Sequence, residues 1–60
     1  MEEGRQGIYL REPQKAFENA IKKGHKVKGH MYMYTREGGG KPYDVFKNIR
    51  TKQHETVFVD

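Results

Sequence analysis

The most regular alternation of residue types along the chain runs from Lys22 to Arg36, KKGHKVKGHMYMYTR. A period of two is typical of a β-strand, because successive side chains of a strand point to opposite faces. One face would carry a row of cations that leads into two tyrosines: Lys26, Lys28, His30, Tyr32, Tyr34 and Arg36. The other would be a core face: Val27, Gly29, Met31, Met33 and Thr35. The pattern therefore predicts a strand with one basic, aromatic face.

An amphipathic helix is predicted just before this strand, over Glu12 to Lys23. Four apolar side chains recur there at the helical period and form one stripe: Ala16, Phe17, Ala20 and Ile21. Pro13 suits the first helical turn, where its missing N–H is not needed. Gly24 can adopt the left-handed conformation that often ends a helix. We expect Met31 and Met33 to pack beneath this helix, against its apolar stripe.

Three shorter apolar runs complete the pattern: Ile8–Leu10, Tyr43–Ile49 and Thr56–Asp60. The first predicts either a strand or a hydrophobic staple for the helix, and the other two predict strands. The segment Glu37–Pro42, EGGGKP, contains three glycines and predicts a hairpin turn. A second polar turn is predicted over Arg50–Glu55. Tyr43–Ile49 carries apolar residues on both faces, so the pattern leaves its core side open.

These elements predict an α+β fold in which one helix packs on a small, mostly antiparallel sheet of three to four strands, in the order β-α-β-β-β. Residues 1–7, MEEGRQG, contain no apolar residue after Met1 and predict a flexible N-terminal segment, with residues 8–60 forming a single domain. A chain of 60 residues builds only a small core, and without cysteine it has no disulfide to support that core. A homodimer is therefore a further possibility.

The charge of the chain is concentrated in one stretch. The net charge is +4, yet residues 21–36 hold five cations and no carboxylate, whereas the segments on either side are close to neutral. A concentrated basic stretch attracts polyanions through its long-range field and through the release of counterions. The expected partner is therefore anionic.

The favoured function is a small non-enzymatic domain that binds nucleic acid, preferably single-stranded or RNA. Tyrosines on an open face can stack with unpaired bases, and cations beside them can bind the phosphate backbone. No helix in the chain carries the polar residues of a duplex-reading recognition helix. The predicted binding residues are those of the basic stretch: Lys22, Lys23, Lys26, Lys28, His30, Tyr32, Tyr34 and Arg36.

Two other interpretations of the same residues stay open. The chain could be a small inhibitor or adaptor, of the kind that phages and viruses encode, which binds an acidic surface of one partner protein. The tyrosines could instead simply cover the sheet, with the lysines preventing edge-to-edge pairing.

Other classes of function find little support. The chain has neither serine nor cysteine as a nucleophile, and His25 and His30 lie five residues apart, on opposite faces of a regular strand. EGGGKP lacks the glycine spacing and the Ser or Thr of a phosphate-binding P-loop. We expect no enzyme activity, no cofactor and no metal. No apolar run is long enough for a signal sequence or a membrane span, so we expect no membrane partner and a cytoplasmic location.

Overall fold

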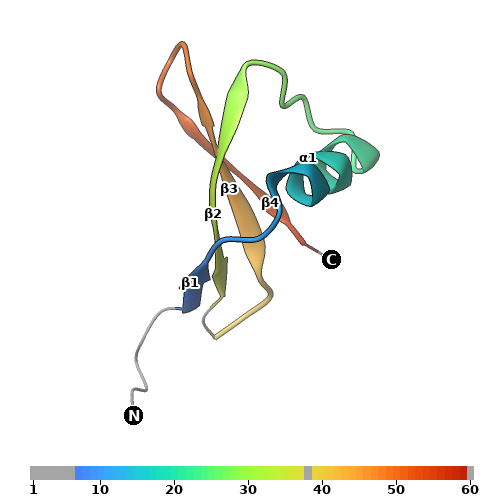
Figure 1. Cartoon of the computed structure of the whole chain (residues 1–60), viewed down its shortest axis with the longest axis vertical. Coiled ribbons are helices and arrows are strands. Elements are labelled where there is room, and N and C mark those ends of the chain that lie inside the picture. The colour runs from blue at the N-terminus through green and yellow to red at the C-terminus, as the bar shows by residue number, and fades with distance from the viewer. Residues whose placement is uncertain (1–6, 38, 60) are drawn as a thin grey trace.

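The computed structural model describes residues 7–37 and 39–59 of the chain. These residues form β1 (Gly7–Tyr9), α1 (Pro13–Lys22), β2 (His30–Glu37), β3 (Tyr43–Asn48) and β4 (His54–Phe58). The four strands make one antiparallel sheet in the order β1-β2-β3-β4, and α1 lies beside it (Figure 1). The predicted α+β domain, with one helix and an antiparallel sheet, is confirmed. The predicted flexible segment lies outside the described residues except for Gly7, which begins β1.

The helix begins and ends where its sequence predicts. Pro13 occupies the first turn, and Gly24 follows the C-cap with a φ of 87°. The amide of Gly24 donates to the carbonyl of Ile21, and the amide of His25 donates to that of Ala20, each at 2.9 Å. This pair of bonds is a Schellman motif, which requires a left-handed residue that glycine adopts without strain. Within the described ranges, no helix has the length and the apolar character to cross a membrane.

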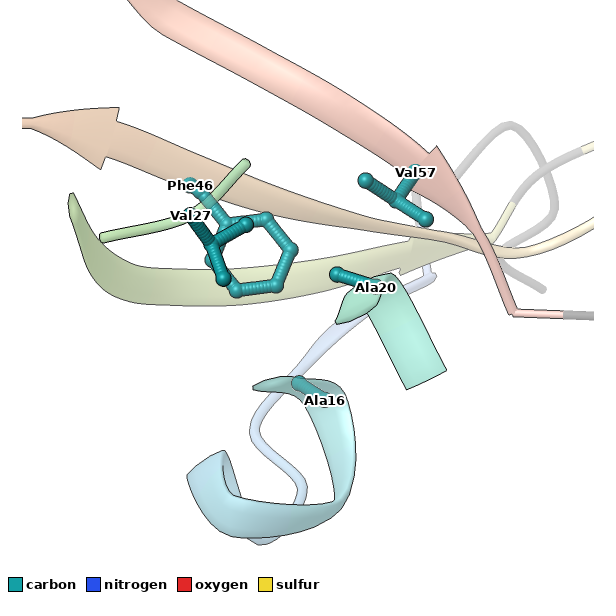
Figure 2. Close-up of a cluster of buried hydrophobic side chains, with 5 residues drawn as sticks. All are labelled: Ala16, Ala20, Val27, Phe46 and Val57. Atoms are coloured by element: carbon teal, nitrogen blue, oxygen red, sulfur yellow. The ribbon is translucent and has the colours of Figure 1, made fainter. Parts of the chain in front are cut away.

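The hydrophobic core lies between α1 and one face of the sheet (Figure 2). Its buried side chains come from the helix, the loop after it and the two C-terminal strands: Ala16, Ala20, Val27, Phe46 and Val57. Ala16 and Ala20 are fully buried, and such small side chains let the helix backbone approach the sheet closely. The Phe17 ring packs on Phe46 with its centroid 5.1 Å away. This arrangement settles the core side of β3, which is the face that carries Phe46.

Two residues predicted for the core lie at the surface instead. Met31 is 46% exposed and Ile21 is 63% exposed, so neither contributes to the cluster under α1. Tyr32 takes the place expected for the methionines, because its ring packs edge to face with that of Phe46 at a centroid distance of 6.0 Å.

The reason for this exchange is an irregularity in β2. Tyr32 pairs with Phe46 and Tyr34 pairs with Val45, so Met33 is an extra residue without a partner across the ladder. Such a β-bulge inserts one residue into one strand and so reverses the alternation beyond it. The prediction that His30, Tyr32, Tyr34 and Arg36 share one face is therefore wrong: the first two face α1, and the last two face away from it.

The predicted strand is also shorter than its sequence pattern. β2 begins at His30, because Gly29 has a φ of 80° and the His30 amide closes a turn onto the Val27 carbonyl at 3.0 Å. Lys26 and Lys28 consequently lie in the connection between α1 and β2, where both are exposed.

A chain of buried polar groups ties the segment before α1 to the sheet. Arg11 binds both carboxylate oxygens of Asp44, Nε to Oδ1 at 2.9 Å and Nη2 to Oδ2 at 2.6 Å. The Thr35 hydroxyl donates to Asp44 Oδ1, so it must accept its contact with Tyr32, whose hydroxyl lies 2.6 Å away. The Arg11 amide donates to that same tyrosine oxygen at 3.0 Å. Asp44 and Thr35 are fully buried, and this network supplies partners for both.

The network also determines the ionisation of Asp44. Burial alone would raise the pKa of its carboxyl, but the hydrogen bonds from Arg11 and Thr35 and the charge of the guanidinium together lower that pKa below its usual value. The hydrogen bond to Asp44 in turn raises the pKa of Arg11. A carboxyl whose pKa is lower in the folded state stabilises the fold above its unfolded pKa, and this contribution is lost as the pH falls through the folded value.

We therefore expect the melting temperature to fall steeply below about pH 4, the unfolded pKa of an aspartate. Asp44→Asn should destabilise the domain by about 3 kcal/mol at neutral pH, because it leaves Arg11 without its ion pair. The substitution should also make the fall of the melting temperature in acid shallower. Thermal unfolding followed by circular dichroism across the acid range measures both effects.

Glu18→Gln on the exposed face of α1 is the matched control and should keep the acid profile of the parent chain. If the melting temperature of Asp44→Asn fell in acid as steeply as that of the parent chain, Asp44 would not be the source of the acid sensitivity.

Candidate functional site

The sheet face that points away from α1, which we call the outer face, is the candidate site. Residues paired directly across antiparallel strands share a face, so the register identifies its members. They form rows that cross the strands: Ile8, Arg36, Tyr43 and Phe58; then Tyr34, Val45 and Thr56; then Met31, Lys47 and His54. No second helix is present in the described chain to cover this face (Figure 1).

Charge is divided unevenly between the two faces of the sheet. The described strands contain three carboxylates, and the register places all of them on the α1 side: Glu37, Asp44 and Glu55. Among the described residues, the outer face holds Arg36 and Lys47 and no carboxylate, and Lys41 lies in the loop at its end. This side of the sheet therefore presents a positive potential to solvent, with no negative side chain among its described members to neutralise it.

Aromatic rings lie among these cations. Tyr43 and Phe58 occupy neighbouring strands, and their rings meet edge to face at 89° with centroids 6.5 Å apart. Phe58 remains 57% exposed, and Tyr34 is half-buried above Val45, which is buried. An exposed ring held by a neighbouring ring offers a flat apolar surface at low cost in conformational entropy.

One end of the outer face is hollowed. A pocket of about 450 Å³ lies between the loop residues 39–41 and the outermost side chains of the sheet, which are Arg36, Tyr43, Thr56 and Phe58. Gly39, with a φ of 78°, turns the loop sharply beside it. The predicted hairpin at EGGGKP is confirmed by the antiparallel pairing of β2 with β3, and its turn forms one wall of this pocket.

The structure brings only part of the predicted binding set to this face. Tyr34 and Arg36 lie on it. Lys22 and Lys23 belong to the C-terminal end of α1, and Lys23 donates through Nζ to the carbonyl of Phe58 at 2.8 Å. Lys26 and Lys28 lie in the connection between α1 and β2, so the continuous cationic row predicted from the alternation is not present.

Two members of the predicted set face α1 and have structural partners. Nε2 of His30 lies 3.1 Å from Oε1 of Glu55, and the histidine side chain is only 10% exposed. The Tyr32 ring packs on Phe46, and its hydroxyl belongs to the buried Asp44 network. Tyr32 is therefore part of the core and cannot present its ring to a base on the outer face.

The sequence interpretation missed four residues of the site: Lys41, Tyr43, Lys47 and Phe58. Tyr43 and Lys47 are four residues apart in β3, so they lie on the same face of the strand, whereas Phe58 and Val57 are neighbours in β4 and lie on opposite faces. This alternation could have assigned Tyr43 and Lys47 to one face from the sequence alone. Their common position beside Arg36 depends on strand pairing, which one sequence does not disclose.

Among the described residues, no three histidine or acidic side chains lie close enough together to hold a metal ion. No known family model, curated protein or solved structure matches this chain. We therefore infer the function from the residues of the outer face.

The opposite environments of Tyr32 and Tyr34 lead to a direct test. Tyr32→Phe removes a hydroxyl that bonds both Arg11 and Thr35, so it should cost about 1–2 kcal/mol of stability. Tyr34 makes no hydrogen bond to another described residue, and Tyr34→Phe should change stability by less than about 0.5 kcal/mol. Urea unfolding of the two variants measures the difference. Equal losses would contradict the reversal of faces at Met33.

Proposed function

We propose that this protein is a non-enzymatic domain that binds single-stranded nucleic acid, including RNA, on the outer face of its sheet. The observation that carries the proposal is the combination of aromatic rings and cations on a face without a described carboxylate. The proposed contacts keep Tyr34 and Arg36 from the sequence prediction and add Tyr43, Lys47 and Phe58 beside them.

The two kinds of side chain would divide the work of binding. Rings stack with bases of any identity, because every base has a π face, and each stack contributes about 1–3 kcal/mol. Lys47 and Arg36 would bind phosphates, which supplies affinity without sequence information. This division suits a binder with little sequence preference and a strong dependence on salt.

Single strands suit this face better than a duplex does. Bases inside a duplex are stacked on one another and cannot lie against Phe58 or Tyr34, whereas unpaired bases can. The major groove of DNA accepts a helix or a two-stranded ribbon, and the outer face is neither. A duplex could therefore contact only the cations of this face, through its phosphates.

Protein recognition is the second candidate, and it is favoured by the exposed apolar side chains on the same face. Ile8 is 53% exposed, Met31 is 46% exposed and Phe58 is 57% exposed. Apolar and aromatic side chains with arginine nearby are typical of protein interfaces. A partner for this face would present an acidic surface.

Fluorescence anisotropy with labelled single-stranded RNA, single-stranded DNA and duplex DNA tests the proposal. We expect saturable binding of the single strands and weaker binding of duplex. Three cations, Arg36, Lys41 and Lys47, give an expected slope of log affinity against log salt of roughly −2, at about −0.7 for each phosphate. Lys47→Gln should reduce the magnitude of that slope by about 0.7.

Lys15→Gln on α1 is the matched control, because it removes the same charge from an exposed position off the outer face. Tyr34→Ala should weaken binding of single strands more than binding of duplex. Failure of the parent chain to bind any of the three probes at low salt would rule out the nucleic-acid function. Tight binding to one acidic protein that polyanions cannot compete away would support the second candidate.

A further inference from the structure

The pocket at the end of the outer face contains polar groups that the fold does not use. The ammonium of Lys41, the hydroxyl of Tyr43 and the hydroxyl of Thr56 make no hydrogen bond or ion pair with any other described residue. The three residues that carry these groups line the same hollow, together with Phe58. Polar groups that converge on an apolar surface without internal partners are what a ligand site requires.

The shape of the pocket limits what it can hold. Its volume of about 450 Å³ lies near the lower end of the range for small-molecule sites, which is roughly 300–1,000 Å³. A cavity of that size accepts one nucleotide and no larger portion of a strand. Gly39 and Gly40 leave its loop wall low, because the positions that their missing side chains would occupy are open space.

The charge of the lining selects an anion. Lys41 and Arg36 both border the pocket, and none of the described residues that line it is acidic. The rings of Phe58 and Tyr43 meet at 89°, and Phe58 remains 57% exposed, so part of its aromatic surface is available for stacking. Aromatic surface and positive charge therefore meet within one small hollow. A nucleotide is complementary to this lining, because it joins an aromatic base to a negatively charged phosphate.

We propose that this pocket is a subsite for one unpaired nucleotide. The base stacks on Phe58, and the phosphate binds Lys41 at the glycine loop. The hydroxyls of Tyr43 and Thr56 are placed to bond the sugar or the edge of the base. This inference rests on the proposed function, and it locates the base-dependent part of the affinity at Phe58.

The test compares two short single-stranded oligomers of equal length by anisotropy: an RNA, and an abasic oligomer with the same number of phosphates but no bases. Phe58→Leu removes the aromatic ring while keeping apolar bulk. It should weaken binding of the RNA by about 5- to 150-fold, which corresponds to the loss of one stacked base. It should leave the abasic oligomer unaffected. Phe58→Tyr keeps a ring and should bind the RNA as the parent does.

Lys41→Gln should behave differently, because it removes a phosphate contact. It should weaken both oligomers to the same extent and lower the magnitude of the salt slope by about 0.7. Ile21→Leu, an equally mild change at an exposed apolar residue of α1, is the control and should alter neither affinity. Circular dichroism of each variant establishes that it is folded.

The outcomes separate this inference from the proposed function. If Phe58→Leu binds the RNA as the parent does while Tyr34→Ala and Lys47→Gln weaken it, the subsite is overturned and the outer face remains the binding surface. If Phe58→Leu weakens both oligomers equally, base stacking in the pocket is also overturned. If the parent chain binds no oligomer, both proposals fail together.

Discussion

One extra residue in β2 decides which side chains this protein buries and which it exposes. Because Met33 has no partner on β3, Tyr32 faces α1 while Tyr34 and Arg36 face away from it. Without the bulge, regular alternation would direct Tyr34 and Arg36 toward the helix together with Tyr32. Thr35 would then point away from the helix side and could not donate to Asp44 there. The bulge thus lets one strand supply both a core tyrosine and residues of the outer face.

The buried Asp44 network depends on the same reversal. Tyr32 and Thr35 can both reach the helix side only because the bulge lies between them, and the tyrosine hydroxyl then joins Thr35 to the Arg11 amide. Arg11 precedes α1, so its two bonds to Asp44 fix the start of the helix relative to the central strand. Few apolar side chains are buried in the described domain, so hydrophobic packing alone would hold the helix against the sheet only weakly. The bonds between Arg11 and Asp44 strengthen this attachment. They also use the one carboxylate of β3 inside the fold.

The same arrangement separates the charges of the described sheet between its two faces. Glu55 is turned toward His30 on the helix side, and Asp44 is paired with Arg11. Among the described residues, Arg36 and Lys47 therefore share their face with aromatic and apolar side chains rather than with carboxylates. The carboxylates of the described strands lie on the other side of the sheet.

Local patterns in the sequence determined the helix, the two hairpins and the α+β class. Pro13 and Gly24 predicted the helix ends, and the three glycines of EGGGKP predicted the turn between β2 and β3, because these residues act through their own backbone preferences. The sequence also indicated Tyr34 and Arg36 as candidate binding residues. The tertiary structure alone decided that Tyr32 and His30 lie on the helix side, that Lys26 and Lys28 precede the strand, and that Tyr43, Lys47 and Phe58 join the outer face. A bulge shifts the alternation without a distinctive residue at Met33, and the register between distant strands is set by packing across the sheet, so neither is encoded in any single stretch of the chain.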